Sequence, residues 1–152
     1  MWISPEFKIY LVKEYQLLKR NKYQNTEWTA KRELSKINYL IHTSTIKENL
    51  IIKNLTNRQI SRIYASEADM LNIVVFNMTA NEWSKENESL KGNIRDYASI
   101  NQLLILANLE SYNSILIKQG FKQKERILLL HKVASKQSQI LESNSQKKIN
   151  SY

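Results

Sequence analysis

The sequence contains no cysteine, one proline and two glycines among its 152 residues. Without cysteine the chain forms neither disulfides nor thiolate zinc sites, which is compatible with the cytoplasmic location that we expect. The shortage of glycine and proline argues against an all-β fold, because tight turns between strands draw on both residues. We therefore predict an all-α helical bundle of about five helices, in a chain large enough to bury a core.

Long apolar runs are also missing. The longest, residues 103–107, has five residues and is followed by Asn108 and Glu110. A helix that crosses a bilayer needs about 20 apolar residues, so no membrane span is predicted. The N-terminus lacks the basic-then-apolar order of a signal peptide, so no leader is expected.

Charge is plentiful and unevenly placed, with a formal net charge of +9. Residues 1–40 hold eight Lys and Arg against four acids, residues 41–90 hold five against six, and residues 91–152 hold ten against four. Cationic ends around a near-neutral middle suit an anionic partner, most simply nucleic acid. The same charge is also common on solvated surfaces that bind nothing, so both interpretations stay open.

Side chains that can cap a helix stand before four of the expected helices. They are Ser4, Thr56, Thr79 and Ser99. The last two have Glu82 and Gln102 three residues later, which completes capping boxes. The expected helices cover residues 5–20, 26–50, 56–76, a short stretch around Trp83, 99–120 and 122–141.

This pattern predicts three regions. Residues 1–24 form an extended N-terminal helix that ends in the polar run 21–25, and residues 25–142 form a helical domain. Residues 143–152 are polar and are predicted to be a disordered tail.

The helix predicted over residues 26–50 has two contrasting faces. Its apolar stripe, which we expect to pack inward, consists of Leu34, Ile37, Leu40 and Ile41. The opposite face gathers Trp28, Arg32, Lys36 and Tyr39. Basic and aromatic side chains together can follow phosphates and stack on bases. The favoured alternative is that the two aromatic rings pack on the first helix, beneath the stems of the basic residues.

Four charged residues stand among apolar neighbours: Glu67, Asp69, Arg95 and Asp96. Unpaired charge is costly inside a protein, so we expect them to pair as a carboxylate–guanidinium network. Such a network would join the helix over residues 56–76 to the loop before the helix over residues 99–120. The alternative is a general acid/base pair in a cleft, which the absence of a nucleophile or metal ligand nearby in sequence disfavours.

No recognisable catalytic motif accompanies these residues. The only histidines, His42 and His131, are far apart and do not form a metal-type pair. The two glycines are isolated, so no phosphate-binding loop is present in the sequence. We predict a protein that is not an enzyme and holds no metal or cofactor. An enzyme would instead need a pocket around the four charged residues.

Several segments resemble bacterial and phage proteins that carry a KilA-N domain. Residues 2–11 (WISPEFKIYL) resemble the end of that domain, where the chain enters a helix. Five further segments resemble the helical region that follows the domain. They are residues 37–39 (INY), 41–43 (IHT), 46–50 (IKENL), 64–69 (YASEAD) and 92–98 (GNIRDYA). The chain departs from the pattern at Asn77, where a glycine is expected, and near Asn87, where a proline is expected. These departures suggest relaxed constraints on the turns, or a decaying prophage copy.

The resemblance implies a DNA-associated protein of phage or prophage origin, related to antirepressors. The DNA-binding residues of the family lie upstream of the matched segment, so no DNA contact is carried over. We expect an interaction or oligomerisation module that forms a dimer and has weak nonspecific affinity for double-stranded DNA. The candidate phosphate contacts are Lys19, Arg20, Lys22, Lys31, Arg32 and Lys36. The alternative is a module that binds a protein partner and never contacts DNA.

Overall fold

The computed structural model describes residues 5–151, apart from the side chains of Phe7, Tyr23 and Gln24. The predicted cap at Ser4 lies outside the described residues. Five α-helices and one 3-10 helix make up this part of the chain, and it contains no strand. They are α1 (Pro5–Asn49), α2 (Asn57–Phe76), α3 (Ala80–Glu86), the 3-10 helix η1 (Ile94–Tyr97), α4 (Ile100–Lys118) and α5 (Gln123–Asn150). The prediction of an all-α fold is confirmed.

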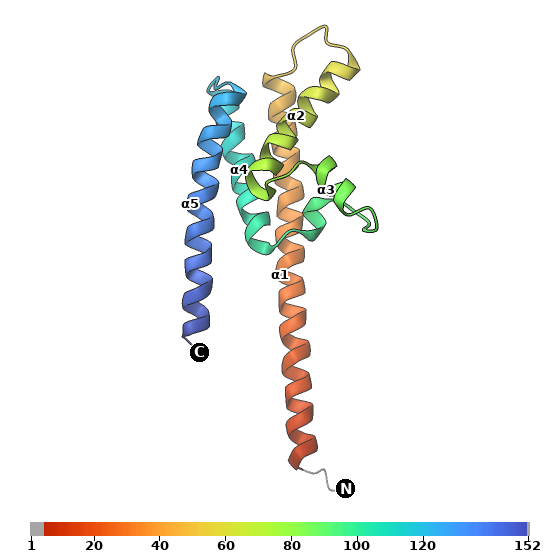
Figure 1. The fold of residues 1–152 in the computed structure, drawn as a ribbon, viewed down its shortest axis with the longest axis vertical. Helices are drawn as coiled ribbons and strands as arrows, with labels where there is room; N and C mark the ends of the chain where they lie inside the picture. The colour runs from red at the N-terminus through yellow and green to blue at the C-terminus, as the bar shows by residue number, and fades with distance from the viewer. Residues whose placement is uncertain (1–4, 152) are drawn as a thin grey trace.

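Helix α1 is continuous over 45 residues, so the predicted break at residues 21–25 is wrong. These residues include neither proline nor glycine, and the other residue types lower helix stability by only tenths of a kcal/mol each, roughly. The hydroxyls of Thr26 and Thr29 donate back to the carbonyls of Lys22 and Asn25, inside the helix. The N-terminal part of α1 projects well beyond the other helices (Figure 1).

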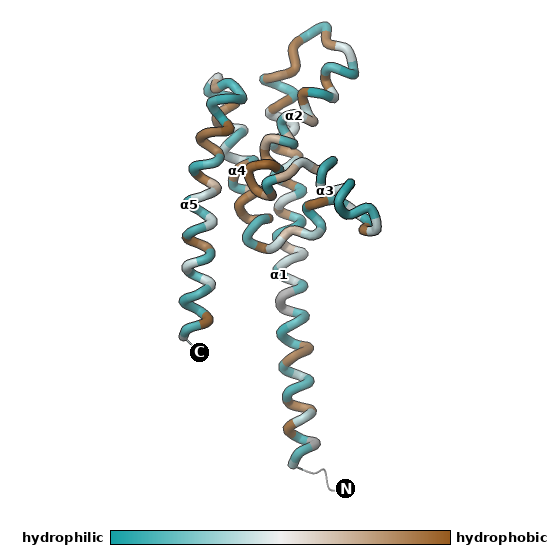
Figure 2. The backbone as a smooth tube through the Cα atoms, in the orientation of Figure 1, coloured by the Kyte–Doolittle hydropathy of each residue, from teal (hydrophilic) through white to brown (hydrophobic). Residues whose placement is uncertain are grey.

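Helix α4 lies at the centre of the bundle, between α1 and α5, and α2 packs against both α4 and α5 (Figure 1). The sequence of α4 is apolar on most sides of the helix, as is usual for a helix with neighbours all round. The apolar core, which appears as brown tube in Figure 2, belongs to α2, α4 and α5. Its buried members are Met70, Leu71, Ile105, Leu106, Leu109, Leu116, Leu130 and Ala134.

The predicted capping signals that fall on described residues are confirmed. Thr56, Thr79 and Ser99 each accept a hydrogen bond from the backbone amide three residues on. Asn77 closes α2 in the left-handed region, with a φ of 61°. Asparagine reaches this region more readily than other non-glycine residues, so the turn constraint persists here with a different residue.

Helix α5 continues to Asn150, beyond the end near Leu141 that the sequence suggested, so residues 143–150 are helical where we predicted a disordered tail. Residues 143–150 are exposed and contain no helix breaker. The hydroxyls of Ser143 and Ser145 donate to carbonyls four residues earlier, which is compatible with a helix. None of the described helices has the length and hydrophobicity that a membrane span requires.

Candidate functional site

A buried ion pair between Glu67 and Arg126 joins α2 to α5. Arg126 Nη1 donates to Glu67 Oε2 at 2.6 Å, and Arg126 Nη2 donates to Glu67 Oε1 at 2.7 Å. The third nitrogen of the guanidinium, Nε, donates to the Phe121 carbonyl at 3.0 Å. Since both carboxylate oxygens are held by the same guanidinium, Glu67 is poorly placed to accept a proton from a substrate.

Asn113 of α4 extends this pair to α1. Its Oδ1 accepts from Arg126 Nη1 at 2.8 Å, while its Nδ2 lies 3.2 Å from Glu67 Oε2 and 2.7 Å from His42 Nε2. Burial lowers the pKa of His42 to about 4, so the ring is neutral near pH 7 and Nε2 accepts the hydrogen bond. We call His42, Glu67, Asn113 and Arg126 the polar network. Four helices contribute one side chain each.

A second buried ion pair joins η1 to α4. Arg95 Nη1 donates to Glu110 Oε1 at 2.8 Å, and Glu110 Oε2 has no hydrogen-bond partner among the described residues. Burial raises the pKa of Glu110 to about 7, against the opposing effect of Arg95. The Arg95 guanidinium also lies 5.1 Å from the centre of the Tyr39 ring. The pKa of this buried carboxyl therefore lies near neutral pH.

The 3-10 helix is held to α1 by a third pair. Arg32 Nε and Nη2 both donate to Asp96 Oδ1, at 3.2 and 3.0 Å. Asp96 Oδ2 accepts from the Asn93 amide, and this bond is the main cause that lowers the pKa of Asp96. Nearby, Trp28 Nε1 donates to the Ala98 carbonyl at 3.2 Å. The basic and aromatic face of α1 therefore packs against the segment around η1, and not against other parts of the first helix.

The four charged residues singled out in the sequence do not form the single network that we expected. Glu67 pairs with Arg126, Arg95 with Glu110 and Asp96 with Arg32, whereas Asp69 lies half-buried on α2 outside these pairs. Three of the four residues are therefore paired, and none of them pairs with another of the four. The partners missed in the sequence were Glu110, Asn113 and Arg126. The sequence does mark two of these partners, because Glu110 and Asn113 are polar residues within the most apolar helix.

The six candidate phosphate contacts fall into two groups. Lys19, Arg20 and Lys22 are exposed on the projecting part of α1. Arg32 is buried in its pair with Asp96, so it is not a surface cation. Lys36 is exposed but pairs with Glu33 at 2.7 Å, and Lys31 is partly buried.

The predicted apolar stripe of α1 faces outward, which corrects the sequence interpretation. Leu34, Ile37, Leu40 and Ile41 are 57%, 53%, 66% and 54% exposed. The face that packs inward is mostly polar. Its buried members are Arg32, Ser35, His42, Thr45 and Ile46. Two of these polar side chains, Arg32 and His42, have partners on η1 and α4, which stabilises this face in the interior. Thr45 donates to the Ile41 carbonyl within α1, and Ser35 Oγ has no partner among the described residues.

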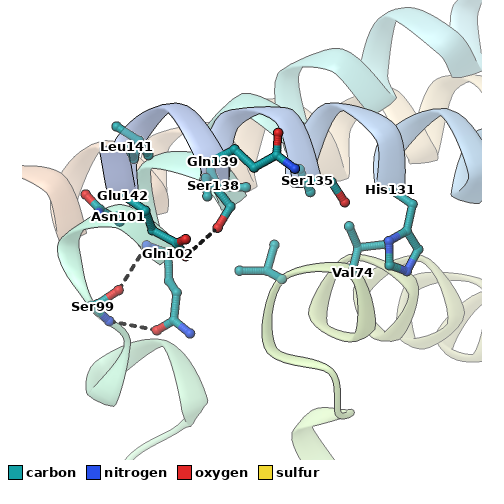
Figure 3. A pocket seen from close by; sticks show the side chains of 13 residues that line it. Val74, Ser99, Asn101, Gln102, His131, Ser135, Ser138, Gln139, Leu141 and Glu142 are labelled. Carbon is teal, nitrogen blue, oxygen red and sulfur yellow. Dashed lines mark hydrogen bonds between the residues drawn. The ribbon is translucent and has the colours of Figure 1, made fainter. Parts of the chain in front are cut away.

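A groove of about 660 Å³ runs between α2, α4 and α5 (Figure 3). Its polar lining includes His131, Ser135 and Gln139 from α5, with Ser99 and Gln102 at the start of α4. The hydrogen bonds drawn there are internal to the helices: the two of the Ser99–Gln102 cap and the one from Ser138 to Glu142. The groove therefore brings together polar groups without a nucleophile–base pair.

Residues 5–151 contain no group of three or more His, Asp or Glu side chains placed to hold a metal ion. No protein-family model matches the chain, and no curated protein is significantly similar to it.

Proposed function

We propose that this chain is a non-catalytic interaction and oligomerisation module that pairs with a second copy of itself through α1. The observation that supports this most directly is the outward apolar stripe of α1, Leu34, Ile37, Leu40 and Ile41. A surface with this many neighbouring aliphatic side chains is typical of an interaction site. The opposite face of the same helix segment already packs on the bundle, so the stripe is available to a partner.

The spacing of the stripe favours a helical partner. Leu34, Ile37 and Ile41 follow the alternating three- and four-residue spacing of a coiled-coil seam. In an antiparallel pair of α1 helices whose two-fold axis passes beside Tyr39, Ile37 of one copy would lie against Ile41 of the other. The projecting part of α1 adds further exposed aliphatic side chains. They are Ile9, Leu11, Val12, Leu17 and Leu18.

Sedimentation equilibrium tests this proposal. The unchanged protein should form a dimer, and the double variant Ile37→Glu/Ile41→Glu should sediment as a monomer, because two carboxylates would enter the seam of each helix. Ile52→Glu is the matched control, since Ile52 is 73% exposed in the loop after α1 and lies away from the stripe. A protein that remains monomeric at high concentration, or a double variant that still dimerises, would contradict the proposal.

A second candidate function is weak, nonspecific binding to double-stranded DNA. It is supported by the exposed cations Lys19, Arg20 and Lys22 on a helix that projects from the bundle. Binding to unrelated duplexes should fall steeply with salt, and Lys19→Gln/Arg20→Gln/Lys22→Gln should reduce the slope. Lys118→Gln/Lys122→Gln/Lys124→Gln is a control of equal charge. A protein-binding module that does not contact DNA would show little binding at any salt.

The resemblance to the region after KilA-N domains extends this proposal. In such a cytoplasmic regulator of phage or prophage origin, the module would act beside a DNA-binding module. Pairing through α1 would then join two of those modules in one dimer, and an antiparallel pair would hold them at opposite ends of the paired helices.

A further inference from the structure

A cavity of about 480 Å³ lies where α1, α2, η1 and the start of α3 meet. Arg32, Lys36 and Arg95 contribute to its wall, and none of its lining residues is acidic. The remaining polar wall comes from Tyr39, Asn72 and Asn93. A volume of this size is in the range of small-molecule sites, roughly 300–1,000 Å³. Three cations from two different elements therefore line one open cavity.

Asn72 is the observation that distinguishes this cavity from an ordinary basic surface. The residue is only 4% exposed, yet its Oδ1 has no hydrogen-bond partner in the described part of the chain. A buried polar group without a partner costs about 1–3 kcal/mol, so such groups are rare without a reason. Oδ1 is itself closed to solvent in this conformation, so a ligand hydroxyl supplies the missing hydrogen bond once the Asn72 amide turns towards the cavity.

The two arginines are held in place by contacts behind the cavity. Arg32 is fixed by Asp96, and Arg95 is fixed by Glu110 and by the face of the Tyr39 ring. These bonds involve Nε and Nη2 of Arg32 and Nη1 of Arg95. A guanidinium has five N–H donors, so each arginine keeps donors for another acceptor. Fixed donors of this kind bind an anion with little loss of side-chain entropy.

We propose that this cavity binds a small organic anion that carries an oxyanion group, carboxylate or phosphate, together with a hydroxyl. The oxyanion accepts hydrogen bonds from Lys36 and from the remaining donors of Arg32 and Arg95. The hydroxyl donates to Asn72 Oδ1. Because the cavity is small and residues of three helices and η1 border it, it suits a compact molecule better than the backbone of a nucleic-acid duplex.

Calorimetric titration of the full chain at constant ionic strength tests the proposal. The probes are inorganic phosphate, L-malate, glycerol 3-phosphate and uncharged glycerol. We expect saturable binding of at least one hydroxylated anion and none of glycerol. Binding of glycerol 3-phosphate alone would assign the oxyanion as phosphate, and binding of malate alone would assign it as carboxylate. No saturable binding of any anion up to tens of millimolar would overturn the proposal.

Two variants separate the cavity from general charge effects. Lys36→Gln should weaken anion binding about tenfold, the equivalent of one charge-assisted hydrogen bond. Asn72→Leu should fold at least as stably, because it removes an unpartnered polar group, and it should weaken hydroxylated anions more than inorganic phosphate. Lys118→Gln, at the end of α4 and outside the cavity, is the control. Equal binding by all three variants would overturn the proposal.

Discussion

Helix α4 has two kinds of neighbour. Towards α2 and α5 it contributes apolar side chains to the core, including Leu106 and Leu109. Towards α1 it meets a face whose buried residues are mostly polar, and α1 contributes no member to the apolar core cluster. One helix is therefore packed by hydrophobic burial on one side and largely by satisfied polar groups on the other.

The apolar and the polar sides of α4 place different requirements on the sequence. Apolar packing is non-directional and tolerates exchange of residues of similar volume. Polar packing fixes one register, because each buried group needs its own partner. A helix docked by polar contacts can also keep its apolar residues for another surface, as α1 does with Leu34, Ile37 and Ile41.

Breaking the polar network should produce the largest effect. Arg126→Met leaves the Glu67 carboxylate buried without its partner, which should lower the free energy of unfolding by about 3–5 kcal/mol. Urea denaturation measures the loss. The double variant Glu67→Leu/Arg126→Met should recover most of it, because no buried charge is left unpaired. Lys132→Met, exposed on the same helix, is the control. A loss no larger than that of the control would mean that the pair is dispensable.

Replacing leucine by alanine in the apolar core and on the outward stripe of α1 compares the stability that each site contributes. Leu106→Ala, at a position with 0% exposure, should cost about 2–5 kcal/mol through lost burial and a cavity. Leu34→Ala removes the same atoms from the outward stripe and should change the stability of dilute, monomeric protein by at most about 0.5 kcal/mol. Both values come from urea denaturation. Similar losses at the two positions would show that the stripe is covered by the chain's own bundle.

Titration should distinguish the two buried ion-pair regions. The pKa of His42 is lowered from 6.5 to about 4, so its contribution to stability is present above pH 6.5 and is lost as the pH falls towards 4. The pKa of Glu110 is raised from 4.5 to about 7, so its contribution is present below pH 4.5 and is lost as the pH rises towards 7. Between pH 4.5 and 6.5 the two trends oppose each other.

Single variants should expose each trend. In Glu110→Gln, stability should rise with pH from about 4 to 6.5, because only His42 remains. In His42→Gln, it should fall as the pH rises from about 4.5 to 7, because only Glu110 remains. Denaturation midpoints across this range measure both slopes. Parallel profiles for the two variants would contradict the assignment.

The comparison also explains which features were predictable from the sequence. The fold class, the end of α2 and the caps at Thr56, Thr79 and Ser99 depend on local chemistry, which the sequence displays directly. Which face of α1 packs inward does not depend on local chemistry. An apolar stripe usually packs inward, but here the partners of Arg32 and His42 lie 64 and 71 residues further along the chain. Such distant pairings are decided by tertiary structure, so the sequence pattern alone favoured the wrong face.

Among the contacts within the bundle, the smallest effect should come from the hydrogen bond of Trp28, at the edge of the contact between α1 and η1. Trp28→Phe keeps an aromatic ring but removes the Nε1 donor to the Ala98 carbonyl, which should cost about 0.5–1.5 kcal/mol in urea denaturation. Trp83→Phe is the control, because Trp83 packs on the Tyr97 ring with 5.3 Å between centroids and no side-chain hydrogen bond of it is found among the described residues. The control should lose less stability than Trp28→Phe. If the two losses were reversed, ring packing would outweigh hydrogen bonding at this edge, and the polar character of the contact between α1 and η1 would be incidental to its stability.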